Sequence, residues 1–314
     1  MRCPKCQFDH ASQTTECLRC GIVFSRFEEP AVLSSTKSNE VVTAPTFAQD
    51  SAEDQVPPRA RNDAYKELKY RIIALPLALL VARLLASSGF GAVSGMLAMV
   101  LHESGHAITA WLVGRWAVPM LWVTMHGDDR SWLVVLAVTT AMGCGGFLAW
   151  RARLWGWVCA AAAMLIVQVV FLKAPAPPGA LIVFGGDGGA LLLSTVLMAA
   201  FYAPRESWVY KNWGLRWGLL VIGALSFMYV FHSWSGPYEN IPFGEIEGVN
   251  LSDPSLLTEM YGWSVIQLVD RYIFLATACL VTLAVVYIWG LIAAYAEIWT
   301  ATHARVSAAS QSSS

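Results

Sequence analysis

Charged residues are scarce in this chain, which argues against an ordinary soluble fold. Only 14% of the 314 residues are Asp, Glu, Lys or Arg, whereas 56% are hydrophobic. Soluble globular domains carry nearer a quarter charged residues. No block of basic residues is present and the net charge is -1, so no nucleic-acid partner is expected. The first residues, MRCPKC, lack the apolar core of a secretory signal peptide, and we expect none.

The hydrophobic residues are concentrated between Ile72 and Trp299. A helix needs about 20 apolar residues to cross the hydrocarbon core of a bilayer. Seven runs approach that length: 72–87, 90–113, 132–149, 155–173, 180–203, 215–233 and 272–297. We therefore expect an all-α polytopic membrane protein with six to seven transmembrane helices embedded in the lipid bilayer. The lower number applies if one central run is a re-entrant hairpin that bends at MGCGGF.

Cysteines suggest a metal site at the N-terminus. Two C-x-x-C pairs are separated by ten residues, and their members are Cys3, Cys6, Cys17 and Cys20. Each pair can place two thiolates on one tight turn, so the two pairs can close a tetrahedral Zn²⁺ site. We expect a zinc-ribbon-like head over residues 1–27, folded by a structural zinc ion. Two interpretations of this head stay open: a unit that zinc only holds folded, or one that also binds a protein partner.

The chain after the head changes composition twice. Residues 28–65 are rich in Ser, Thr, Glu, Ala and Pro, and predict a flexible linker. The transmembrane domain is expected over 66–300, and a disordered tail over 301–314. Basic residues before the first span favour a cytoplasmic N-terminus, as does the reducing compartment that thiolate ligands need. They are Arg59, Arg61, Lys66, Lys69 and Arg71.

Three ionisable residues interrupt the second apolar run, in the sequence LHESGH. His102 and His106 are four residues apart and share one face of a helix, while Glu103 lies about 100° around it. The H-E-x-x-H spacing presents two imidazoles to one metal ion and sets a carboxylate beside the metal-bound water, where it can act as general base. Ionisable groups inside a membrane usually serve function. The alternative is a polar network that joins helices.

A third protein ligand would complete a catalytic zinc site. Asp187 is the only acidic residue between Asp129 and Glu206, and it lies in the glycine-rich sequence FGGDGG of a later apolar run. Glycines allow another helix to approach closely. We expect Asp187 to be the third ligand. The alternative is a carboxylate paired with a Trp, Tyr or Arg of a neighbouring helix.

Three sequences carry a family resemblance: HESGHA, the WLVGRWAVPMLWVTMHG that follows it, and the distant DGG. Together they resemble the site-2 protease family of intramembrane zinc metalloproteases, in its divergent bacterial branch. The similar part covers about residues 90–203. The resemblance implies a small β-sheet after the HESGHA helix, His102, His106 and Asp187 as zinc ligands, and Glu103 as general base. It also implies a transmembrane protein segment as substrate and a bacterial inner membrane as location.

An acidic stretch, residues 233–270, separates the last two apolar runs. Within it SDPSLLTE predicts a helix with Asp253 as N-cap and Pro254 as its first residue. That helix either lies on the membrane or over the site, or packs as an ordinary loop helix.

For the whole chain two functions stay open: a zinc endopeptidase, or a non-catalytic zinc protein acting as sensor or scaffold through its ribbon. Both contain two zinc ions.

Overall fold

The computed structural model describes residues 58–88, 91–246 and 250–312. Helices dominate this part of the chain, accompanied there by two small antiparallel sheets of two strands each. The described part is therefore all-α in class, as expected. The predicted zinc ribbon, with Cys3, Cys6, Cys17 and Cys20, lies outside the described residues.

The helices run in the order α1 Pro58–Ala86, α2 Gly91–Leu112, α3 Trp132–Arg151, α4 Trp155–Lys173, α5 Pro178–Ala199, α6 Trp208–Lys211, α7 Trp213–Ser235, α8 Asp253–Ser255 and α9 Val265–Ser312. Single turns follow or link them: η2 Ala200–Tyr202, η3 Tyr238–Asn240 and the π-helical η4 Leu256–Met260. The strands are β1 Ala117–Pro119, β2 Thr124–His126, β3 Glu245–Ile246 and β4 Asn250–Leu251. β1 pairs with β2, and β3 with β4.

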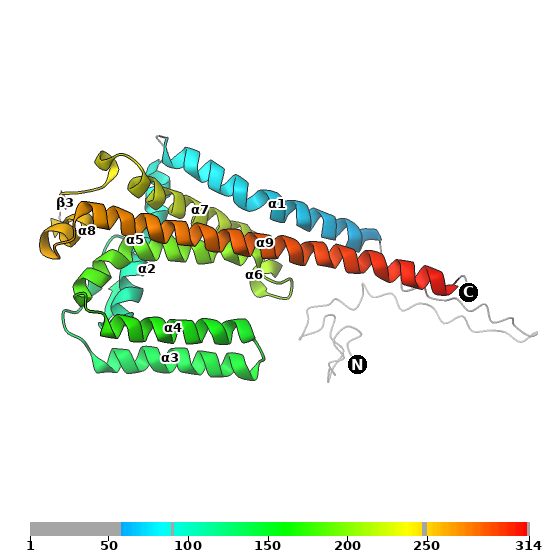
Figure 1. Ribbon diagram of the computed structural model, residues 1–314, viewed down its shortest axis with the longest axis horizontal. Coiled ribbons are helices and arrows are strands. Elements are labelled where there is room, and N and C mark those ends of the chain that lie inside the picture. Colours follow the sequence, from blue (N-terminus) through cyan, green and yellow to red (C-terminus); the bar gives the residue numbers. More distant parts are fainter. Residues whose placement is uncertain (1–57, 89–90, 247–249, 313–314) are drawn as a thin grey trace, which may run out of the picture. The chain divides into compact units, whose positions relative to one another are not determined.

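Five of the described helices are long and apolar enough to cross a membrane, and they indicate an integral membrane protein. They are Trp132–Arg151, Trp155–Lys173, Pro178–Tyr202, Val265–Thr300 and Trp213–Ser235. The number rises to six if α1 and α2, which pass the same test as a pair, form one broken span; they are bent by 112° at the break (Figure 1). We expected six to seven spans; the count of seven treats these two helices as separate spans, whereas the described residues offer at most six.

The bend of the apolar region lies between α1 and α2, and the MGCGGF sequence does not form one. α3 is a continuous helix through Gly143 and Gly145, and neither glycine has a neighbour that an added Cβ would meet. α3 and α4 form a hairpin (Figure 1). A continuous helix satisfies its own backbone hydrogen bonds in an apolar medium, so glycines there do not break it.

Two expected irregular segments are partly helical. α1 begins at Pro58, inside the predicted linker 28–65, because proline fits the first turn of a helix. α9 continues to Ser312, through most of the tail that was expected to be disordered. Extending an existing helix is much easier than starting one, and the alanines of this tail favour the extension.

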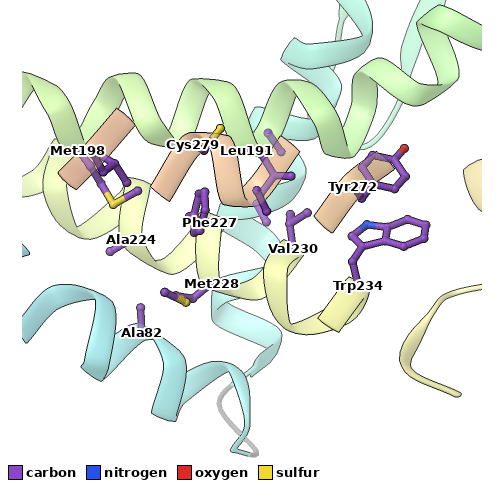
Figure 2. Close-up of a cluster of buried hydrophobic side chains, with 14 of the residues drawn as sticks. Ala82, Leu191, Met198, Ala224, Phe227, Met228, Val230, Trp234, Tyr272 and Cys279 are labelled. Atoms are coloured by element: carbon purple, nitrogen blue, oxygen red, sulfur yellow. The ribbon is translucent and has the colours of Figure 1, made fainter. Parts of the chain in front are cut away.

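One apolar core joins α1, α5, α7 and α9, and α2 crosses these helices near one end (Figure 1). Figure 2 shows the middle of this core, where Leu191 and Met198 of α5 face Phe227 of α7. Trp234 and Tyr272 lie together at one end of the same cluster, with ring centroids 4.1 Å apart. The core is therefore continuous from the bundle to the aromatic pair.

A buried ionic cluster connects α1 and α7 elsewhere in the bundle. Glu67 of α1 accepts hydrogen bonds from Arg216 of α7, at 2.6 and 3.1 Å, and from Arg71, at 2.7 Å. Arg71 also donates to the carbonyl oxygens of Ala203 and Gly290, and Arg216 is only 1% exposed. Because each charge has partners, the cluster fixes α1 against α7 and α9 without leaving an unpaired buried ion.

Glycines allow α2 and α5 to pack backbone against backbone. A Cβ on Gly105 of α2 would meet the carbonyl oxygens of Gly185 and Gly186, and one on Gly189 would meet the Cα of Gly105. A Cβ on Gly186 would lie 2.6 Å from atoms of both His102 and His106. The glycines around Asp187 thus bring the two motif helices into direct contact, as the sequence indicates.

Candidate metal centre

Helix α2 presents both motif histidines on one face, and each Nδ1 has an acceptor. His106 Nδ1 lies 2.8 Å from the carbonyl oxygen of Ile182, and His102 Nδ1 lies 2.9 Å from Oδ1 of Asp187. A carbonyl oxygen and a carboxylate can only accept, so both Nδ1 atoms donate. In a neutral imidazole this leaves Nε2 with a free lone pair, which is the form that binds metals.

The two Nε2 atoms converge on a carboxylate from a distant part of the chain. They lie 3.0 Å from each other, and Oδ2 of Asp253 lies 3.1 Å from that of His102 and 3.0 Å from that of His106. Three electron-pair donors this close repel one another unless a proton or a metal cation lies among them. His102, His106 and Asp253 are accordingly a group that could hold a metal ion.

The donor set fits a zinc ion. Two imidazole nitrogens and one carboxylate oxygen are the ligands of many catalytic zinc sites, and tetrahedral ligands at about 2.0–2.1 Å lie about 3.3 Å from one another. The three donors here are therefore only a few tenths of an ångström closer than in a loaded site. Oδ2 of Asp253 is also buried without a hydrogen-bond partner. Buried polar atoms rarely lack a partner, so this atom fits a ligand role.

Asp253 has the protonation state that a ligand needs. Burial alone would raise the pKa of its carboxyl group, but positive charge at the neighbouring His106 outweighs burial and lowers that pKa below its ordinary value. A cation at the two Nε2 atoms, whether proton or metal, thus keeps the carboxylate ionised.

Asp187 lies on the other side of His102. Its Oδ1 accepts from His102 Nδ1, and its Oδ2 accepts from Nε1 of Trp234 at 2.7 Å. Both of its oxygens are thus engaged by donors, and the group that could hold a metal does not include it. The geometry thus brings Asp253, and not Asp187, to the two Nε2 atoms, and places Asp187 against Nδ1 of His102. A tryptophan partner was the alternative left open by the sequence.

Glu103 is held by the loop that follows α2. Its Oε2 accepts a hydrogen bond of 2.7 Å from Thr124 Oγ1, which also lies 2.8 Å from the carbonyl oxygen of Glu103. Thr124 begins β2, and β1 and β2 form the small sheet that the family resemblance implies at this point. Glu103 is 5% exposed, so this hydroxyl fixes a carboxylate that has little access to bulk water.

A folded loop carries Asp253 to the histidines. Ser252 and Gly244 are joined by a backbone hydrogen bond, and Gly244 N–H donates to Oγ of Ser255. Leu257 is fully buried in the main core, and the ring of Tyr261 packs over Gly179 at the start of α5. These contacts hold the described part of the segment between α7 and α9, residues 236–246 and 250–264, against the bundle; we call this part the 236–264 loop.

Asp253 was not identified as a site residue from the sequence, which predicts it as an N-cap. Ser252 takes the N-cap position instead, and Asp253 is the first residue of α8. The side chain is thereby free to reach the imidazoles. No spacing relates residue 253 to the HESGH motif. The one signal in the sequence is that the 233–270 stretch has six acidic residues and no Lys, Arg or His to pair with them.

No protein-family model matches this chain, and no curated protein or solved structure matches it either.

Proposed function

We propose that the chain is an intramembrane zinc metalloprotease of the site-2 protease type. The observation that carries the proposal is the convergence of His102 Nε2, His106 Nε2 and Asp253 Oδ2 within about 3 Å, next to a buried glutamate in the H-E-x-x-H motif. The apolar helices around this group support a substrate that lies in the membrane. A transmembrane segment of another protein, locally unwound, is the proposed substrate.

Each residue has a separate task in this proposal. His102, His106 and Asp253 would hold the zinc ion, which when bound supplies Lewis-acid activation of water and of the peptide carbonyl. Glu103 takes a proton from water through its carboxylate and passes it to the amine that leaves. Thr124 keeps that carboxylate in one orientation through the 2.7 Å hydrogen bond. Asp253 lies against both histidines, whose side chains are only 18% and 11% exposed, which limits the entry of bulk water.

Zinc content tests the metal sites. We propose two zinc ions per full-length chain, one in the membrane site and a structural one on Cys3, Cys6, Cys17 and Cys20. The chain purified in detergent should lose one zinc when His106 is replaced by Ala and the other when Cys3 is replaced by Ser. Zinc content that is the same in His106→Ala and wild type would overturn the site.

Cleavage tests the reaction. The probes are single-span membrane reporters of varied sequence, each co-expressed with the full-length chain. Glu103→Gln should keep zinc and abolish cleavage of any reporter that the wild type cuts, because the amide cannot accept the proton. Glu259→Gln, which alters an exposed acid of the 236–264 loop, is the matched control and should cut normally. Equal rates for Glu103→Gln and wild type would exclude the mechanism.

A second candidate is a non-catalytic zinc protein that acts as sensor or scaffold through its ribbon. One observation favours it: the Glu103 carboxylate is already hydrogen-bonded to Thr124. A wild-type chain that binds zinc at the membrane site and leaves all reporters intact would support this candidate. Under both candidates we propose a bacterial inner membrane and a cytoplasmic N-terminus, with a protein partner for the ribbon under the second.

A further inference from the structure

We infer that Asp187 is a positioning residue for the metal centre, which it serves by orienting His102 and not by binding the metal. This inference rests on the proposed function and names the role of a residue that the motif resemblance would make a ligand. Its basis is the chain of contacts from His102 through Asp187 to Trp234, which runs from α2 through α5 to α7.

The first step is the state of the carboxylate. Asp187 Oδ1 faces His102 Nδ1 at 2.9 Å, on the opposite side of the ring from Nε2, and Oδ2 faces Trp234 Nε1 at 2.7 Å. Both distances fit charge-assisted hydrogen bonds. A carboxylate whose two oxygens are occupied in this way is already paired, whereas Oδ2 of Asp253 is buried without such a partner.

The second step is the rigidity of Trp234. Its ring stacks on Tyr272 of α9, with centroids 4.1 Å apart (Figure 2), and Tyr272 stacks on Phe184 of α5 at 4.5 Å. The Tyr272 hydroxyl also donates to the carbonyl oxygen of Phe184 at 3.3 Å. The indole is thus held between helices from three parts of the chain, so its N–H fixes the direction of the Asp187 carboxylate.

The third step is the effect on His102. A carboxylate that accepts a hydrogen bond from Nδ1 fixes the tautomer and the ring plane of a metal-binding histidine. It also makes Nε2 a stronger electron-pair donor to the metal. His106 has a neutral acceptor in the same place, the carbonyl oxygen of Ile182. The two histidines are therefore unequal, and the charged acceptor makes His102 the stronger ligand of the pair.

The test is metal affinity of the full-length chain in detergent, in a Cys3→Ser background that leaves the membrane site. Zn²⁺ affinity is measured by competition with a chelator, and the ligand set by the absorption spectrum of bound Co²⁺. Asp187→Asn and Asp187→Ala should bind one metal ion about 10–100-fold more weakly than the Cys3→Ser chain without further change, with the same Co²⁺ band position as that chain. Asp187→Asn should be the milder change, since its amide oxygen still accepts from His102.

A second pair of variants keeps the test open if the Asp187 variants do not fold. Trp234→Phe removes the indole donor but keeps an aromatic ring, and should weaken Zn²⁺ binding about tenfold. Trp289→Phe makes the same exchange at an exposed tryptophan of α9 and is the matched control, with unchanged affinity. Equal affinities for these two variants would overturn the inference, as would wild-type affinity in both Asp187 variants.

Other outcomes separate this inference from the proposed function. If Asp187→Ala binds no metal while Asp253→Ala keeps the wild-type Co²⁺ spectrum, Asp187 is the ligand and the inference is wrong, although the metal site stands. If the Cys3→Ser chain with no further change binds no metal, the proposed function fails and the inference fails with it. Weaker binding that is accompanied by an altered Co²⁺ spectrum would also contradict a role confined to positioning.

Discussion

Oδ2 of Asp253 lies 3.0 Å from Nε2 of His106, although the two residues are separated by five helices of the chain. This contact joins the 236–264 loop to the helix that carries the HESGH motif. It makes the loop part of the candidate metal centre, and the consequences can be measured.

Removing the Asp253 carboxylate should remove the metal from the membrane site. Asp253→Ala should weaken Zn²⁺ binding more than about 100-fold, beyond the range expected for a residue that only supports a ligand. Asp253→Asn should also bind weakly, because a neutral amide is a poor zinc ligand. Chelator competition on the full-length chain provides the measurement, with Glu259→Gln of the same loop as control. Tight binding by both Asp253 variants would show that the loop does not hold the metal.

A methyl group at residue 186 should disturb the two imidazoles. The Cβ of Gly186→Ala would lie 2.6 Å from atoms of His102 and His106, so the rings must move. Overpacking of this kind costs about 1–3 kcal/mol. We expect Zn²⁺ affinity to fall about 5–150-fold, the equivalent of that energy. Gly143→Ala, where an added Cβ meets no atoms, is the control and should bind normally. Equal affinities in the two variants would mean that the rings are free to shift.

The hydroxyl of Thr124 should matter for turnover and not for metal content. Thr124→Val removes the 2.7 Å hydrogen bond to Glu103 and keeps the shape of the side chain. A misplaced general base lowers kcat, and we expect a fall of about 10–100-fold with zinc unchanged. Thr124→Ser keeps the hydroxyl and should restore most of the rate. The measurement is reporter cleavage together with zinc content; a loss of zinc in Thr124→Val would indicate a different role.

The buried ionic cluster should contribute more to stability than an exposed ion pair does. Arg216→Leu removes the two hydrogen bonds from Arg216 to Glu67 and keeps the one from Arg71, and loss of a buried hydrogen-bond partner costs about 1–3 kcal/mol. Glu297→Gln breaks the Arg205–Glu297 contact, whose side chains are 35% and 45% exposed, and should cost about 1 kcal/mol or less. Unfolding in denaturing detergent distinguishes the two. A similar loss of stability in both variants would show that burial does not strengthen the Glu67 cluster.

The sequence was sufficient where one local pattern determines the structure. Apolar length predicted the five spanning helices, and the i, i+4 spacing of His102 and His106 predicted that both imidazoles face one place. The glycines around Asp187 predicted a close helix contact, and α5 does pack on Gly105 of α2. These features depend on periodicity and on side-chain volume, which can be read directly from neighbouring residues.

The sequence was insufficient where residues far apart in the chain compete for one partner. Asp187 and Asp253 both reach His102, one at Nδ1 and the other at Nε2, and only the packing of the 236–264 loop assigns them. The helix predicted there is short and partly π-helical, so Leu257 is buried while Met260 is 67% exposed. The 112° bend between α1 and α2 is also a tertiary feature that apolar length does not reveal.

The place of Asp253 in the chain has a consequence for biosynthesis. The ribosome makes both histidines early, while the carboxylate that meets them emerges only after α7 has been completed. In the proposed site the nascent protein would thus hold two of three ligands through most of its insertion. A site that needs all three ligands would be complete only once the chain beyond α7 has been made.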